Sequence, residues 1–558
     1  MNEFELKFKI PAQSLPKIVA AVHAKKAQLQ LLQACYFDTE DGALAKNGLT
    51  LRMRKEGNVW VQTAKQLTNN ALERLEHNVE IGRIQTNAVK TNAVKINAVN
   101  IKVLDYKTAN KLTNLMPSID LYRHADEKIG KLIMCALKVK LNRAIPTLVL
   151  LYKTDVQRLK FNVKHAGSLI EIALDQGMVI SGGRSAALCE LEIELKQGAP
   201  EHAVALARTW CAKYGLWLSI INKSMEGQRL HDGLSSSQKK QKSVAGKPDL
   251  KSDANSQQMV KAVFQSCLNE ILANASEIGA GKPFNGDNHN QYAEHIHQMR
   301  VGIRRLRTAM RELNILVDGI DPAWEKPLID TFRALGEHRD NDYLNLILQP
   351  QIVAAGGPAI STHVDVAKRL DASAVVRSKA FQDTLLCLIA YVNSRYLDGL
   401  SPTDAENVAE NATENYSHKK VRNLLANRLN KLHEKIVKEG KKFLSLTGTQ
   451  QHSVRKHFKR LRYLAEFSAP HFSMLEKKRT LVFITALKPV QDALGFYNDE
   501  LVGLQTYRKL VATDKRAWFG AGWLSARRKS NAKKCQQQID IFIKKTKKNK
   551  SKLRTTKI

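Results

Sequence analysis

The chain has 558 residues, of which 43% are apolar, and its 88 Lys and Arg against 53 Asp and Glu give a net charge of +35. This apolar fraction excludes wholesale disorder, and no run approaches the ~18 apolar residues of a membrane span. So large a positive excess predicts a polyanionic partner, which could be nucleic acid, an anionic membrane or polyphosphate.

Residues 1 to about 230 show the alternation of β-strands. Charged and apolar residues alternate over 3–8, 49–54 and 190–196, which places the charged side chains of each segment on one strand face. The start of the chain follows this pattern and lacks the apolar core of a signal peptide. Seven scattered cysteines without a CxxC pair or a Cys/His cluster favour neither disulfides nor zinc, and they predict a reducing cytoplasm.

The charged strand faces carry a chemical prediction. Glu190, Glu192 and Glu194 lie in a row, and three such carboxylates repel one another unless cations sit among them. Mg²⁺ binds through a few carboxylates and substrate phosphates, while Arg and Lys are the natural partners of phosphate. A closed sheet lined in this way is predicted to hold a metal-bound oligophosphate and to hydrolyse a phosphoanhydride bond.

An insertion and a linker interrupt the chain. Residues 86–100 hold three copies of a five-residue unit, TNAVK, TNAVK and INAVN, a period too short for a solenoid repeat. We expect an expanded, basic loop within an insertion over about 82–145. Residues 233–256 are rich in Ser, Lys, Gln and Asp, which is typical of a linker. The first domain is therefore predicted over 1–232.

Residues 257–526 are predicted to form an all-α domain, because apolar residues recur there at helical spacing. Two segments, 297–307 and 452–462, each place a His and three basic residues at i, i+3, i+7 and i+10, on one helix face. We call these segments the two basic combs. LGEHRD at 335–340 and LGFYND at 494–499 repeat at a similar distance, so a duplicated bundle is predicted. Residues 527–558 form a basic tail that is either solvated or an arm for a polyanion.

Nine ordered segments of the first half resemble the CYTH, or triphosphate tunnel, family and its bacterial inorganic triphosphatases. They are 3–7 (EFELK, an ExExK pattern), 36–39, 51–54, 60–65, 74–76, 154–158, 171–177, 189–194 and 222–224. The resemblance implies an eight-stranded antiparallel tunnel that binds triphosphate with Mg²⁺ or Mn²⁺. The implied metal ligands are Glu3, Glu5, Glu190, Glu192 and Glu194, supported by Glu76 and Asp175. The implied phosphate ligands are Lys7, Arg52, Arg54, Lys65, Arg74, Arg158 and Lys223. Catalysis would rest on Glu3, Glu5, Lys7, Glu192 and Glu194.

The two combs and the LGxxRD segment resemble the CHAD family of conserved-histidine α-helical domains. This resemblance implies a helical bundle with a basic groove that binds inorganic polyphosphate. The implied lining is His297, Arg300, Arg304, Arg307, His452, Arg455, Lys459 and Arg462. Arg339, Asp340 and Asp499 are expected to hold these bases in place. Binding is expected to strengthen below about pH 6.5, where ordinary histidines gain charge.

The chain is thus predicted to be an α+β protein with a β tunnel followed by a helical bundle. Its predicted function is metal-dependent hydrolysis of tripolyphosphate, in a cytoplasmic protein that could associate with polyphosphate granules. One alternative is a polyphosphate-binding protein with little catalysis. Another is an enzyme that acts on nucleotides or thiamine triphosphate. Nucleic acid is a less favoured partner, through the tail, because the combs lack interleaved aromatic residues for base stacking.

Overall fold

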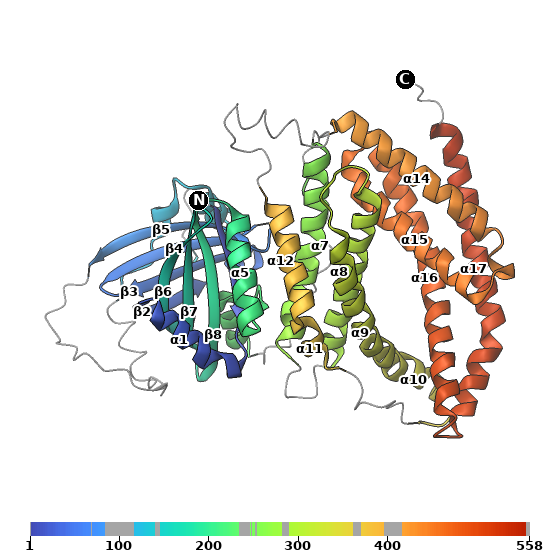
Figure 1. Ribbon diagram of the computed structural model, residues 1–558, viewed down its shortest axis with the longest axis horizontal. Helices are drawn as coiled ribbons and strands as arrows, with labels where there is room; N and C mark the ends of the chain where they lie inside the picture. The colour runs from blue at the N-terminus through green and yellow to red at the C-terminus, as the bar shows by residue number, and fades with distance from the viewer. Residues whose placement is uncertain are drawn as a thin grey trace. The chain divides into compact units, whose positions relative to one another are not determined.

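The computed structural model describes residues 2–68, 70–83, 116–139, 146–233, 246, 248–250, 254–281, 289–360, 370–394 and 416–553. They form two compact units, the first drawn mainly from residues 1–241 and the second from residue 242 onward (Figure 1). The TNAVK repeat at 86–100 and most of the predicted linker lie outside the described residues.

The first unit is a closed antiparallel barrel. Eight strands pair in the order β5-β4-β3-β2-β6-β7-β8-β1, and a β1–β5 pairing closes the ring, while the two-residue strand β9 adds to β1. The predicted eight-stranded tunnel is therefore confirmed. The strands are β1 Asn2–Lys9, β2 Gln28–Asp38, β3 Leu49–Glu56, β4 Val59–Leu67, β5 Glu73–Arg83, β6 Val149–His165, β7 Ser168–Ser181, β8 Arg184–Gln197 and β9 Trp217–Leu218.

Helices cover the outside of the barrel, and this explains why its strands turn their charged faces inward. The apolar face of β1, with Phe4, Leu6 and Phe8, is buried. Helix α5 (Pro200–Tyr214) packs against β1 and β8. A further outer core joins Leu51 and Ala64 to α4 (Lys128–Ala136). Because successive strand residues point to opposite faces, burial of the apolar residues outside commits the alternate, charged residues to the interior. The remaining helices of this unit are α1 Leu15–Ala24, α2 Ala43–Lys46 and α6 Lys223–His231.

Helix α6 brings a lysine into the barrel from outside the sheet. Asn222 caps its first turn by accepting a hydrogen bond from the backbone N–H of Met225 at 2.8 Å. Gly227 lies so close to β6 that a Cβ atom there would be 2.1 Å from the ring of Tyr152. This close approach holds the first residue of the helix, Lys223, at the tunnel.

The second unit is helical, as predicted. Its longer helices are α7 Ser256–Gly279, α8 His289–Leu313, α9 Glu325–Tyr343, α12 Lys379–Asn393, α14 His418–Gly440, α15 Gly448–Ser468, α16 Met474–Leu510 and α17 Ala517–Leu553. The shorter ones are α10 Gln349–Ala354 and α11 Ala372–Arg377. The two combs fall on α8 and α15, and the LGEHRD and LGFYND segments fall on α9 and α16. None of the helices within the described ranges is long and apolar enough to cross a membrane.

The predicted basic tail is structured as far as Leu553, because α17 runs through residue 527 without a break. Cys535, Ile539, Phe542 and Ile543 are buried at helical spacing along it. Such spacing marks one face of an amphipathic helix. Beyond residue 527, the cations of this stretch whose side chains the structure describes, Arg528, Lys529, Lys533, Lys534, Lys544 and Lys545, are exposed on the outer face of this packed helix.

Candidate functional site

The barrel interior is a charged cavity of about 490 Å³. Its lining includes nine Lys and Arg and seven Glu side chains. All seven predicted phosphate ligands line it, namely Lys7, Arg52, Arg54, Lys65, Arg74, Arg158 and Lys223. Glu3, Glu5, Glu76, Glu192 and Glu194 line it too, whereas Asp175 and Glu190 are more deeply buried, at 0% and 1% exposure.

Three carboxylates meet at one level of the sheet, across three adjacent strands. Glu5 on β1 faces Glu194 on β8, and Glu194 faces Glu171 on β7. Like charges in directly opposed positions are destabilising. Here cations flank the row: Lys7 lies 3.0 Å from Glu5, Lys196 lies 2.6 Å from Glu194 and Lys160 lies 3.2 Å from Glu171. We call Glu5, Glu194 and Glu171 the carboxylate row.

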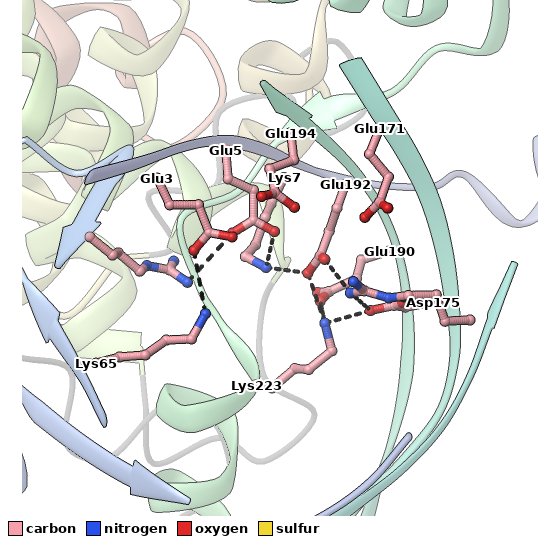
Figure 2. Close-up of polar contacts among 12 residues, drawn as sticks. Glu3, Glu5, Lys7, Lys65, Glu171, Asp175, Glu190, Glu192, Glu194 and Lys223 are labelled. Atoms are coloured by element: carbon pink, nitrogen blue, oxygen red, sulfur yellow. Dashed lines mark hydrogen bonds and ion pairs between the residues drawn. The ribbon is translucent and has the colours of Figure 1, made fainter. Parts of the chain in front are cut away.

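Glu3 and Glu76 form a second crowded pair beside the row (Glu3 is labelled in Figure 2). Burial raises the pKa of Glu3 to about 8, and its carboxylate neighbours Glu76 and Glu5 add to the shift while Lys65 opposes it. The pKa of Glu76 is lowered despite its burial, through Lys65, a hydrogen bond with Glu3 and Arg52. At neutral pH this pair therefore keeps a proton. A divalent cation would neutralise the same charges, so the donor set fits an oxygen-ligated metal such as Mg²⁺ or Mn²⁺.

Asp175, Glu190 and Glu192 form a compact acidic cluster within 4.8 Å of one another. The ammonium of Lys223 lies among them, 2.7 Å from Asp175, 2.5 Å from Glu190 and 2.8 Å from Glu192 (Figure 2). Arg158 also donates two hydrogen bonds of 2.7 Å to Asp175. Although burial opposes it, the carboxylates Asp175 and Glu190 raise the pKa of Lys223 well above its ordinary value. The cluster thus already holds a cation, and Asp175 and Glu190 position Lys223 and Arg158.

The opposite wall presents guanidinium groups whose terminal nitrogens pair with carboxylates, Arg52 with Glu76 at 3.8 Å and Arg54 with Glu56. The Nε atoms of Arg52 and Arg54, both on β3, are buried without a hydrogen-bond acceptor among the described residues. Burial and the neighbouring Arg52 lower the pKa of Arg54. Buried donors without acceptors are costly, and phosphate oxygens would satisfy them by the bidentate geometry that suits arginine.

Sequence reasoning missed four charged residues of the cavity lining, Glu56, Lys160, Glu171 and Lys196. Each continues a face that was already recognised. Lys160 follows Arg158 by two residues, Lys196 follows Glu194 by two, and Glu171 precedes Asp175 by four. The period-two rule, extended along the full strands, could have found them.

In the helical unit, α8 and α15 bring the centres of the two combs together. Arg300 and Arg304 on α8 interact with Arg455 and Lys459 on α15, and Arg339 of α9 joins them. We call these five residues the basic cluster. The nearby carboxylates are Asp340 and Asp499, and Arg455 lies 3.9 Å from Asp499. Burial, reinforced by Arg304 and Arg455, lowers the pKa of Lys459 to about 6. Burial also lowers the pKa of Arg300 to about 10. Cations so poorly compensated indicate a place for an anion.

The last arginine of each comb is paired with other side chains. Arg307 donates to Glu325 at 2.8 Å, and Arg462 donates to Glu466 at 2.7 Å and to Gln491 at 3.0 Å. These two predicted polyphosphate ligands already have side-chain partners, so the unpaired charge is concentrated at the comb centres.

The pKa values of the two comb histidines, His297 and His452, are lower than the ordinary histidine value expected from the sequence. Burial lowers the pKa of His297 to about 4, helped by Arg339, whose Nε lies 3.4 Å from the His297 ring. Burial also lowers the pKa of His452, which contacts Asn498 at 3.0 Å. His297 therefore stays neutral near pH 6.5 in the free protein, and His452 gains charge at a lower pH than an ordinary histidine. Within the basic cluster, the pKa that lies near that pH is the pKa of Lys459.

Two known domain families match the chain, one in each of its two units. Residues 1–224 match the CYTH domain family and residues 262–508 match the CHAD domain family. Over 236 residues the chain is 25% identical to an inorganic triphosphatase of Haemophilus influenzae, which corresponds to 41% of this chain and 55% of that protein. The chain thus spans about half the length of this relative.

Two solved structures are also similar. The CHAD domain of the plant Ricinus communis aligns with 53% of this chain and 95% of its own, at 21% identity and a TM-score of 0.41. A Hippeastrum protein described by a dominant triphosphatase activity aligns with 42% of this chain and 97% of its own, at 17% identity and a TM-score of 0.27.

Proposed function

Because this chain joins a CYTH domain to a CHAD domain, we propose that it is a metal-dependent triphosphatase that hydrolyses inorganic tripolyphosphate and binds inorganic polyphosphate. The observation that carries the proposal is the composition of the barrel interior. One cavity of about 490 Å³ places the carboxylate row opposite two arginines, Arg52 and Arg54, whose buried Nε atoms have no acceptor among the described residues. Binding an anion alone gives no reason for so many carboxylates.

The residues have separable roles. Glu3 and the carboxylate row would hold Mg²⁺ or Mn²⁺, with Glu192 beside them. The metal would neutralise phosphate charge and lower the pKa of a bound water. Arg52, Arg54 and Arg158 would bind phosphate oxygens and stabilise charge on the transferred group. Lys7 lies between Glu5 and Glu192, where it would bind the end of the phosphate chain next to the metal.

The lining favours an inorganic substrate over a nucleotide. Among the described residues that line the cavity, one is aromatic, Tyr36. Its ring stacks on Tyr152, with the ring centroids 4.6 Å apart. That stacking occupies a face that a base or thiazole would need. The Haemophilus relative is named an inorganic triphosphatase, which supports the same choice.

For the helical unit, the basic cluster supports polyphosphate binding. The five cations of the basic cluster have two nearby carboxylates, Asp340 and Asp499. Burial lowers the pKa of one of these cations, Lys459, to about 6. A phosphate chain supplies the missing negative charge and has no bases to accommodate. The proposal includes a cytoplasmic location and association with polyphosphate granules. The seven free cysteines support the cytoplasmic location, because a reducing compartment keeps thiols free.

Phosphate release from tripolyphosphate, ATP, thiamine triphosphate and long-chain polyphosphate, each with Mg²⁺, Mn²⁺ or EDTA, tests the proposal. We expect metal-dependent release that is fastest with tripolyphosphate. Faster release from ATP or thiamine triphosphate would identify the nucleotide-type alternative. Tight polyphosphate binding without release from any substrate would identify a binding protein.

A further inference from the structure

A cavity of about 160 Å³ lies inside the helical unit, and its described lining includes no residue of the basic cluster. Its walls come from α14, α15, α16 and α17 (Figure 1), and from Phe472 just before α16. On α15 it is lined by Ala465, six residues beyond Lys459. At ~100° per residue, Ala465 lies on a different side of α15 from Lys459. We call this space the helical cavity.

The walls of the helical cavity are largely apolar. Ala426 and Leu429 line it from α14, Phe483 lines it from α16, and Phe472 adds a second phenyl ring. The ring of His433 also lines it, with its centroid 5.8 Å from that of Phe483. An apolar cavity of ~150 Å³ holds one benzene ring, and aromatic side chains favour a flat ring beside them. The volume and the walls therefore suit a ligand with one six-membered ring.

Several polar side chains of the helical cavity already have partners within the protein. His433 contacts the hydroxyl of Thr546 at 3.1 Å, and Thr480 donates to the backbone carbonyl of Glu476 at 2.8 Å. The carboxylate of Glu476 accepts from the backbone N–H of Ser473 at 2.9 Å, as part of the capping box of α16. These contacts hold the helices themselves and leave little capacity for a ligand.

Arg479 on α16 and Asn430 on α14 also line the helical cavity. Neither side chain forms a hydrogen bond or an ion pair within the described parts of the chain. Although partial burial opposes it, hydrogen bonds with Ser473 and the nearby Arg422 and Arg479 lower the pKa of Glu476, so this carboxylate is already shared. Arg479 is half-buried and Asn430 is exposed, which places the unused donors where the cavity meets solvent.

We propose that the helical cavity binds a small aromatic carboxylate with one ring. This ligand class is distinct from the phosphates of the proposed function. The ring lies among the apolar walls, and the carboxylate accepts two parallel hydrogen bonds from Arg479, in the bidentate geometry that suits arginine. The side-chain amide of Asn430 is a further donor.

Other ligands match the helical cavity less well. A phosphate chain gains nothing from apolar walls, and an uncharged ring leaves Arg479 without a partner. The hydrocarbon chain of a membrane lipid is too large for a space of about 160 Å³. The walls thus select the ring of the ligand, and Arg479 selects its charge.

The test uses the full chain and fluorine NMR of para-fluorobenzoate, whose signal shifts and broadens when the ring enters a protein. Two compounds are titrated in parallel: para-fluorobenzamide has the ring without the charge, and trifluoroacetate has the charge without the ring. Arg479→Gln removes the guanidinium, and its control Lys477→Gln, at an exposed position of the same helix, changes the net charge equally. Ala426→Leu fills the cavity, and its control Ala526→Leu adds the same groups at an exposed position of α17.

We expect saturable binding of para-fluorobenzoate that unlabelled benzoate displaces. Arg479→Gln should weaken this binding about 10-fold, as expected for loss of a hydrogen bond between charged groups, and should leave the weaker binding of para-fluorobenzamide unchanged. Ala426→Leu should weaken the binding of both ring compounds, and the two control variants should weaken neither. Thermal melts followed by circular dichroism check that every variant is folded.

Tripolyphosphate hydrolysis and polyphosphate affinity should be the same in all four variants, so failure of this proposal is distinguishable from failure of the proposed function. Absence of saturable binding to the native chain would overturn the proposal. Binding that a folded Ala426→Leu variant retains would also overturn it, because the ligand would then lie outside the cavity. Equal effects of Arg479→Gln and Lys477→Gln, or equal affinity for trifluoroacetate, would do the same.

Discussion

Single carboxylates of the barrel differ in what surrounds them, and this decides which ones can hold a metal. Glu192 accepts hydrogen bonds from Lys7, Arg158 and Lys223. Glu5 and Glu194 face each other across β1 and β8. Loss of charge at Glu192 would therefore disturb three buried cations. Loss of charge at Glu5 or Glu194 removes a partner of Lys7 or Lys196 but also relieves the repulsion between the two carboxylates.

We predict that Glu5→Gln or Glu194→Gln lowers tripolyphosphate turnover with Mg²⁺ by roughly 10²–10³-fold, the usual cost of removing one group that stabilises transition-state charge. The fold should persist, because the amide keeps the shape of the side chain. Initial rates across a Mg²⁺ titration and thermal melts check both points. Glu80→Gln, an exposed residue of β5, serves as the control. Near-native turnover in either variant would show that the carboxylate row does not hold the metal.

Lys459 gives the helical unit a pH dependence. Its pKa is lowered to about 6 by burial and by Arg304 and Arg455, so it is mostly neutral at pH 7.5. A bound polyanion favours the ammonium form. Polyphosphate binding should therefore take up a proton between pH 6 and the ordinary lysine pKa, and affinity should rise as pH falls towards 6 and level off below it.

Calorimetry at pH 7.5 in two buffers of different ionisation enthalpy measures this proton uptake. We predict close to one proton for the native protein and much less for Lys459→Arg, because arginine stays charged. His297→Gln should keep the uptake, since burial lowers the pKa of that histidine to about 4. Uptake that disappears with His297 and persists without Lys459 would assign the proton to the histidine.

Much of the barrel site could be predicted from sequence, because strand alternation alone tells which side chains share a face. The pattern placed Glu3, Glu5 and Lys7 together, and all three line the cavity. It could not reveal that Lys223, from a helix, lies among Asp175, Glu190 and Glu192. Nor could it reveal the burial that lowers the pKa of both comb histidines. Both depend on contacts between residues far apart in the chain.

Between elements, the sequence repeat of LGEHRD in LGFYND supplies a matched pair of glycines. Gly336 on α9 belongs to LGEHRD, and a Cβ atom there would lie 2.2 Å from Nη1 of Arg300 on α8. Gly495, the matching residue of LGFYND on α16, has open space at the same point. The missing side chain at Gly336 therefore makes room for Arg300, which donates to the carbonyl of Phe332 at 2.9 Å.

We predict that Gly336→Ala displaces the Arg300 guanidinium and weakens polyphosphate binding about 10-fold, with little change in melting temperature because only a flexible side-chain end must move. Gly495→Ala should bind normally and be slightly stabilised, since alanine favours a helix by up to ~1 kcal/mol over glycine. Filter binding and thermal melts of the two variants make the comparison. Equal binding by both would mean that Arg300 does not contact the ligand.

Buried ion pairs join the two halves of the bundle. Glu312 on α8 is fully buried and accepts from Arg428 on α14 at 2.7 Å and from Arg460 on α15. Arg305 of α8 likewise donates to Glu466 of α15 at 3.0 Å. These contacts set the faces of α8 and α15 that bring the comb centres together.

Glu312→Ala should lower the free energy of unfolding by about 3–5 kcal/mol, because it leaves two arginines without their buried partner. Glu325→Ala, which removes the more exposed partner of Arg307, should cost no more than about 1 kcal/mol. Urea unfolding followed by circular dichroism measures both. Similar small losses would show that water replaces Glu312 readily.

Helices were predicted correctly where residues of one kind recur at helical spacing, and one was missed where many charged residues obscured the spacing of the apolar ones. The combs were recognised because basic residues recur every three or four positions on α8 and α15. In α17 the same spacing of Cys535, Ile539 and Phe542 was obscured by the many lysines around them, so a tail was predicted where a helix packs. Composition describes the exposed face of such a helix and says little about its buried one.

At the scale of the whole molecule, the two units use different chemistry and should respond differently to metal removal. We predict that EDTA abolishes tripolyphosphate hydrolysis and leaves polyphosphate affinity unchanged at constant ionic strength, because the basic cluster uses fixed protein charges. Paired activity and binding assays on one sample check this, and excess Mg²⁺ should restore hydrolysis. Weaker polyphosphate binding in EDTA would mean that a metal bridges the anion to the helical unit.

The closure of the barrel by β1 also determines when the proposed activity can first appear. Glu5 on β1 pairs with Glu194 on β8, far along the chain. At ~5–20 residues per second, a ribosome makes β8 roughly 10–40 s after β1. Strand β5 is made early in that interval, but β1 lacks β8, with which it pairs at six positions against three with β5, until the interval ends. Contacts so distant in sequence form slowly. A nascent chain should therefore show no phosphatase activity until β8 has left the ribosome, and Phe4, Leu6 and Phe8 make its first strand a natural client for a ribosome-bound chaperone.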